Sequence, residues 1–232
     1  MKKTTIFISL LFCLLFSANA QKKQLLTIRF DNRFGTERLQ PEQSFYLNEN
    51  DTLVINRFKY YISHIQLIDF TGKTIVPENQ YYLIDIADEK STAIQLSVPE
   101  GRYTGIRFLI GVDSIRNVSG VQTGALDPLH GMFWTWNSGY IMAKLEGKAS
   151  SSMIAGKQFT YHIGGFRRHH NTTRLIELQA PAFTDSLTII ANAATWFNGI
   201  HIAKEPVCHS PGGLAVRFAD NYSKMFSIQS KQ

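Results

Sequence analysis

The sequence predicts an all-β protein: a single antiparallel β-sandwich of about nine strands with a short C-terminal helix. Apolar and polar residues alternate with a period of two along most of the chain, which is typical of half-buried strands. Aromatic residues make up 12% of the 232 residues, and 16 are Phe and 9 are Tyr, a composition that favours pleated sheets. Strand-like and helix-like segments do not alternate, so a parallel α/β sheet is not expected.

The first twenty residues have the pattern of a secretory signal peptide. Lys2 and Lys3 supply the positive start, an apolar run covers 6–16, and the small residues Ala18 and Ala20 precede a cleavage site after Ala20. We therefore expect residues 1–20 to be a signal peptide and residues 21–232 to form one β-sandwich domain in the periplasm or outside the cell. Losing the leader removes two lysines, which lowers the formal charge from +6 to +4.

Nine segments of the mature chain share the alternating pattern, and turn residues separate them. They are 26–30, 53–70, 82–86, 94–98, 103–110, 140–145, 159–163, 175–178 and 187–190. Near the end, Leu214, Phe218, Tyr222 and Phe226 recur every fourth residue, and this spacing predicts one helix with an apolar stripe.

Composition also excludes several classes of function. A content of 44% hydrophobic against 18% charged residues excludes a disordered chain. A charge of +4 does not indicate nucleic-acid binding, and no later segment is long enough for a membrane-spanning helix. After cleavage Cys208 is the sole cysteine, so no internal disulfide is expected. The common hydrolase, metalloprotease and nucleotide-binding motifs are absent, and we expect no enzymatic activity.

The most unusual segment is 111–147, which holds two of the three tryptophans. In an extended segment Trp134 and Trp136 point to the same side as Met132, close in sequence to His130. Such a group of indoles and a thioether either surrounds a bound ligand or fills the space beneath a long loop.

Several runs in this segment and beyond it form one pattern: Gly111-Val112-Asp113, Leu126-Asp127-Pro128, Gly131-Met132-Phe133-Trp134-Thr135-Trp136, Gly139-Tyr140, Leu145-Glu146-Gly147 and Tyr161-His162-Ile163-Gly164-Gly165. In this pattern the mature chain resembles the MbnP-like family of exported proteins, named for a member associated with the copper chelator methanobactin. The resemblance implies a β-rich, copper-binding protein. It also implies a tryptophan oxidised to kynurenine by a dihaem, peroxidase-like partner enzyme of the MauG type.

Histidine and methionine side chains are the ligands that copper would take. We rank His162 first, because it falls on the family pattern and lies beside glycines that permit a close approach. His130 is second, since it neighbours the indoles. His64 is third, because the family pattern often has Asn at this position. Trp134 and Trp136 are both candidates for modification.

Two alternatives stay open at this stage. An exported β-sandwich could instead bind glycan or a surface protein partner by stacking it on exposed Trp134, Trp136 and Tyr140. A family member could also keep the fold and lose the metal, and the departure from the pattern at His64 is compatible with such a loss.

Overall fold

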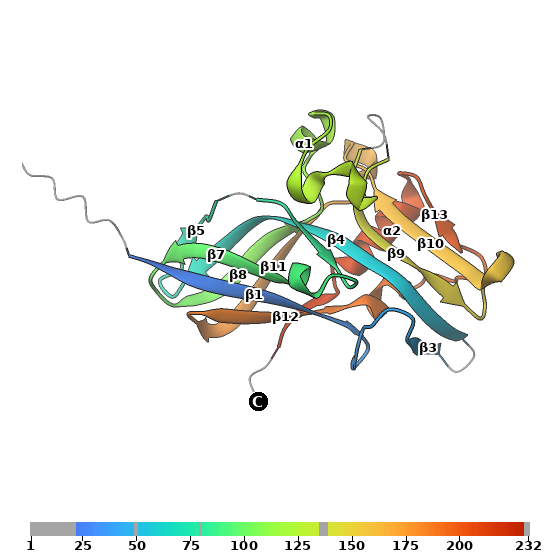
Figure 1. The fold of residues 1–232 in the computed structure, drawn as a ribbon, viewed down its shortest axis with the longest axis horizontal. Coiled ribbons are helices and arrows are strands. Elements are labelled where there is room, and N and C mark those ends of the chain that lie inside the picture. The colour runs from blue at the N-terminus through green and yellow to red at the C-terminus, as the bar shows by residue number, and fades with distance from the viewer. Residues whose placement is uncertain (1–21, 49–50, 79, 135–138, 230–232) are drawn as a thin grey trace, which may run out of the picture.

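Two stacked β-sheets form a sandwich, and the part of the chain around α1 (Ser114–Val118) projects from it at the top of Figure 1. The structure is a computed structural model that describes residues 22–48, 51–78, 80–134 and 139–229. The predicted all-β sandwich and C-terminal helix are confirmed. Within the described residues, no helix is long and apolar enough to cross a membrane.

The smaller sheet has the order β14-β12-β1-β2, with β7 also paired to β1. Its strands are β1 (Lys23–Phe34), β2 (Glu37–Arg38), β7 (Ala93–Pro99), β12 (Ser186–Asn192) and β14 (Phe226–Ile228). The larger sheet has the order β11-β8-β4-β9-β10-β13, and β3, β5 and β6 also pair with β4. Its strands are β3 (Ser44–Asn48), β4 (Asp51–Asp69), β5 (Thr74–Ile75), β6 (Tyr82–Asp85), β8 (Tyr103–Ile110), β9 (Ile141–Ala149), β10 (Gln158–Gly164), β11 (Arg174–Phe183) and β13 (Val207–Cys208).

The strand pairing differs from the expected antiparallel arrangement in two places. The β1–β12 and β10–β13 pairs are parallel, so the sandwich is mixed. Alternation of apolar residues reports which face of a strand is buried, but not the direction of the neighbouring strand.

The main core lies between the sheets and is rich in aromatic side chains. Phe30 of β1 makes edge-to-face contacts with Tyr60 of β4 and Phe108 of β8, a geometry that aromatic pairs prefer. The helix α2 (Gly213–Tyr222) covers one end of this core through Phe218 and Tyr222, which contact the ring of the buried Trp196. Phe226, expected on the same helix, lies in β14 instead, because α2 ends at Tyr222.

The long strand β4 presents side chains to both faces of the larger sheet. Phe58, Tyr60 and Ile62 belong to the core between the sheets. Lys59 and Tyr61 therefore point to the outer face, since neighbouring side chains alternate along a strand. Tyr61 belongs to a second cluster, the outer-face cluster, whose buried members lie in or beneath the 111–142 segment. These are Tyr61, Val112, Leu126, Met132, Tyr140, Ile141 and Met142.

Candidate metal centre

Two histidines lie side by side on the outer face of the larger sheet. The parallel pairing of β10 with β13 sets Tyr161 opposite Cys208, and both are buried in the main core. The residues that follow, His162 on β10 and His209 directly after β13, consequently point to the opposite, outer face. Their rings are stacked, with centroids 4.7 Å apart and an interplanar angle of 29°. We call these two residues the histidine pair.

A carboxylate holds one ring of the histidine pair in place. His162 Nε2 lies 2.6 Å from Glu146 Oε1, and Arg57 Nη1 lies 2.6 Å from Glu146 Oε2. In the neutral ring this contact requires Nε2–H to donate to the carboxylate, which leaves Nδ1 with its lone pair. Histidines that bind metals usually donate their other N–H to a carboxylate or carbonyl in this way.

The electrostatics favour an ionised Glu146 and a neutral His209. The hydrogen bond from His162, together with that from Arg57, lowers the pKa of Glu146 to about 2. Burial, with a smaller effect of neighbouring His162, lowers the pKa of His209. Neutral imidazole is the form that coordinates a metal.

A row of charged residues crosses the sheet beside the histidine pair. Lys59, Lys144 and His162 are direct cross-strand neighbours on β4, β9 and β10. Like charges placed opposite each other destabilise a sheet. Each of the two lysines has a partner of its own that offsets this repulsion. Lys59 Nζ lies 2.8 Å from Asp85 Oδ2, and buried Lys144 donates to the carbonyl oxygen of Gly131 over 2.5 Å. Lys144 thereby ties the segment before the tryptophans to the sheet.

Trp134 lies at the border between this row and the outer-face cluster. Its ring packs on Gly164, where an added Cβ would lie 2.7 Å from Trp134 Cζ3 and 2.7 Å from the carbonyl oxygen of Tyr140. Gly164 follows His162 by two residues on β10, a spacing of about 7 Å. The room that a glycine leaves here is filled by the indole. Trp136 lies outside the described residues.

His130, the second predicted ligand, is exposed at the end of the short 3₁₀ helix Pro128–His130. Its Nε2 lies 3.0 Å from the carbonyl oxygen of Gly124. The next residue, Gly131, accepts the hydrogen bond from Lys144. His130 is therefore close in sequence to a contact of the charged row, but its ring contacts Gly124 instead.

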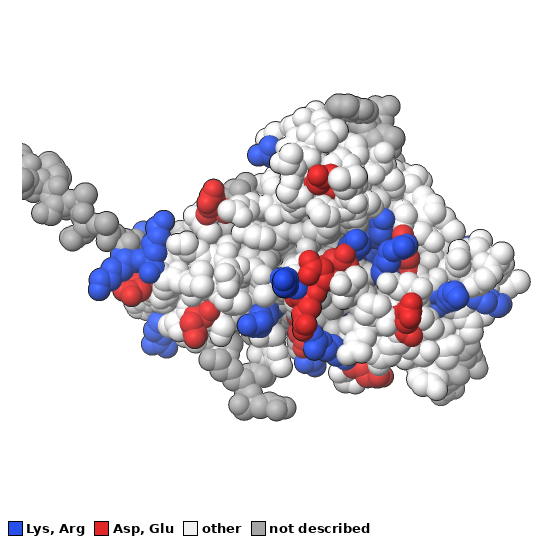
Figure 2. Space-filling model, in the orientation of Figure 1, with Lys and Arg blue, Asp and Glu red and all other residues white. Residues whose placement is uncertain are grey.

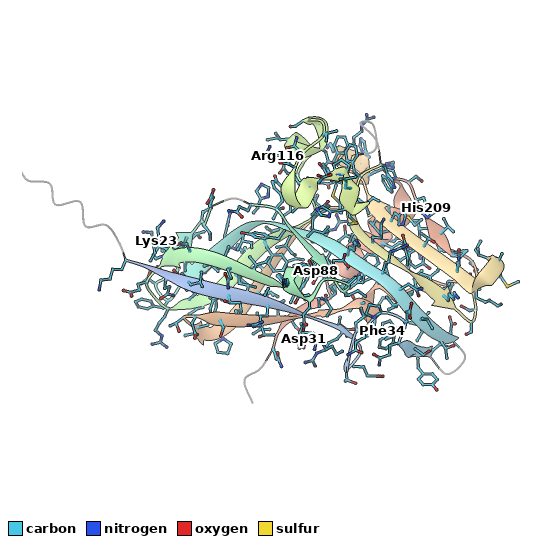
Figure 3. The ribbon with its side chains drawn as sticks, viewed as in Figure 1. Lys23, Asp31, Phe34, Asp88, Arg116 and His209 are labelled. Carbon is cyan, nitrogen blue, oxygen red and sulfur yellow. The ribbon has the colours of Figure 1, made fainter. Side chains whose placement is uncertain are left out.

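His64, the third predicted ligand, does not share a site with His162. It lies five residues beyond Lys59 on β4, which corresponds to about 16 Å along the strand. Its Nε2 faces Asp113 Oδ2 at 3.6 Å instead. Asp113 caps the helix α1 (Ser114–Val118). In Figure 3, Arg116 on the α1 projection and His209 beside β13 lie well apart. His64 therefore lies apart from the histidine pair.

Other candidate groups in the sequence have structural partners. The Asp127 side chain caps the 3₁₀ helix by accepting from the Leu129 amide over 2.9 Å. Burial raises the pKa of the Cys208 thiol to about 11, so little thiolate is available as a soft ligand. Tyr140 is buried and donates to the Leu126 carbonyl over 2.8 Å, which removes it from an exposed stacking platform. Within the described ranges, no group of three or more His, Cys, Asp and Glu side chains is placed to hold a metal ion.

The sequence and the structure were compared with those of known proteins. The family model described as MbnP matches residues 23–210, which is most of the chain. The chain belongs to the MbnP family. A solved structure, MbnP from Methylosinus trichosporium, has 18% sequence identity and a TM-score of 0.64, with 84% of this chain and 87% of that chain covered. No curated protein matches the sequence.

The resemblance to the MbnP family expected from the tryptophan segment is thus confirmed. The likeness to the M. trichosporium protein shows a shared fold. Two residues of the site were not ranked from the sequence, His209 and Glu146. The signal for His209 was its place beside Cys208, and only the pairing of β13 with β10 brings it to His162.

Proposed function

We propose that this MbnP family member is an exported copper-binding protein that serves copper acquisition or handling and is not an enzyme. The observation that carries the proposal is the histidine pair, in which Glu146 orients His162 and burial lowers the pKa of His209. A pair of imidazoles suits copper, which prefers nitrogen and sulfur donors. In this assignment His162 and His209 hold the metal, and His130 and His64 do not.

The proposal includes export and an oxidised tryptophan. The leader ending near Ala20 supports passage to the periplasm or the cell exterior. Trp134 is our candidate for conversion to kynurenine by a dihaem, peroxidase-like partner, because its ring is half-buried beside the strand that carries His162. Trp136 is the second candidate.

The position of the copper ligands is tested with Cu(I) and a competing chelator under reducing conditions, where carboxylate sites compete poorly. We expect the parent protein to retain one tightly bound Cu(I), and His162→Ala and His209→Ala each to lose it. His130→Ala is the matched control and keeps the metal.

Far-UV circular dichroism of each variant checks that the sandwich is intact. Full copper loading in a folded His162→Ala variant would remove the histidine pair as the site. If His130→Ala lost copper and His209→Ala retained it, the copper site would lie at His130 and not at the histidine pair.

A further inference from the structure

A second group of metal-ligating side chains lies on the outer face, away from the histidine pair. His64 comes from β4, Tyr81 from the residue before β6, and Asp113 from the turn that starts α1. His64 Nε2 lies 3.6 Å from Asp113 Oδ2, and the same oxygen accepts a hydrogen bond from the Tyr81 hydroxyl. The rings of His64 and Tyr81 meet edge to face, with centroids 5.9 Å apart.

The hydrogen bonds of Ser63 determine which nitrogen of His64 carries the lone pair. The Ser63 hydroxyl donates its one proton to the Gly111 carbonyl over 2.9 Å. Its oxygen can therefore only accept from His64 Nδ1, 3.1 Å away. In the neutral ring Nε2 is then unprotonated and directs its lone pair toward the Asp113 carboxylate.

The distance between these two acceptors matches that of two ligands on one metal ion. At 3.6 Å the gap between Nε2 and Oδ2 is too long for a normal hydrogen bond. Metal bonds of about 2.0–2.2 Å to imidazole and carboxylate separate the two ligand atoms by about 3.4–3.6 Å at tetrahedral to trigonal angles. A cation between the atoms would turn a repulsive contact into an attractive one.

The backbone at His64 is strained in a way that places its ring there. His64 has a φ of +53°, in the left-handed region that residues other than glycine seldom adopt. The strand has a bulge at this point, where the register to β8 shifts between Ser63 and Gln66. Strain of this kind is concentrated at functional sites, and bulges can re-aim a side chain.

We propose that His64 and Asp113 bind a divalent transition-metal ion of the Zn(II) type, with the Tyr81 hydroxyl orienting the carboxylate. The side chains of His64 and Asp113 are 39% and 22% exposed, so water completes the coordination. Arg116 faces the group from α1, with its guanidinium 5.8 Å above the Tyr81 ring and a hydrogen bond to Gln122. Its charge weakens cation binding, and that of Asp113 opposes this effect. This site does not depend on the copper proposal.

The test uses purified protein that carries His162→Ala and His209→Ala, which removes the histidine pair. Zn(II) is titrated against a chromophoric chelator. We expect this background to bind one equivalent, and added His64→Ala to weaken binding at least about tenfold. Asp113→Asn should do the same while preserving α1, because Asn is as good an N-cap as Asp.

His130→Ala in the same background is the control and should bind Zn(II) unchanged. Thermal unfolding of each variant confirms that the fold is retained. A background that binds no Zn(II), or equal binding after both His64→Ala and Asp113→Asn, would overturn the proposal.

Discussion

Adjacent tyrosines on β4 show how one position in the sequence changes the environment of a side chain. The Tyr60 hydroxyl points into the main core and donates to Asn32 Oδ1 over 2.9 Å. Tyr61 points to the outer-face cluster, and within the described residues its buried hydroxyl has no hydrogen-bond partner. Burial raises the pKa of both phenols, so both are protonated at neutral pH.

The two tyrosines should respond oppositely to removal of the hydroxyl. Tyr60→Phe leaves buried Asn32 without its donor, and we expect the free energy of unfolding to fall by about 1–2 kcal/mol. Tyr61→Phe removes an unpaired buried polar group, so stability should be unchanged or rise by up to about 1 kcal/mol. Urea denaturation measures both, each serving as the control for the other. Equal destabilisation by the two variants would show that the Tyr61 hydroxyl has a partner.

At the scale of the elements, the contact between Trp134 and strand β10 determines where the tryptophan lies relative to the histidine pair. The register of β10 to β9 shifts between Ile163 and Gly164, directly beneath Trp134. A side chain at Gly164 would meet both the indole and the Tyr140 carbonyl. The close approach of loop and strand therefore depends on the absence of a Cβ.

We expect Gly164→Ala to lower the free energy of unfolding by about 1–3 kcal/mol, because the ring or the backbone must move. Gly101→Ala is the matched control. No atom lies within 4 Å of a Cβ built at Gly101, so its effect should stay within about 0.5 kcal/mol. Chemical denaturation compares them, and equal stability of the two variants would contradict the packing described here.

Long strands were predictable because their inward residues repeat every second position over many residues. All nine predicted segments correspond to strands, and β4 and β8 match the expected ranges to within a few residues. The short strands β2, β3, β5, β13 and β14 and the short helix α1 were not foreseen, because two to five residues give no measurable period. The histidine pair was half predictable for the same reason: His162 lies on a long strand, but the place of His209 depends on β13.

The whole molecule combines a closed core with an outer face that carries the histidine pair. The sandwich buries one side of the larger sheet, and residues 111–134 and 139–142 cover part of the other. Figure 2 shows acidic and basic side chains interspersed over the middle of the visible face, whereas the projection around α1 is mostly uncharged. The histidine pair lies at the border of the covered area, where His162 is half-buried and His209 is exposed. The sequence could not predict the position of this border, because it depends on which face of the sheet is covered by the residues that precede β9.

The central claim, that this protein carries copper beside an oxidised tryptophan, is tested most directly by native mass spectrometry. The protein is isolated from the envelope fraction of copper-replete cells of its own host, and the intact ion is weighed and then fragmented. We predict one bound copper and an oxidised residue at Trp134 or Trp136. A chain that carries neither the metal nor the modification would contradict the claim.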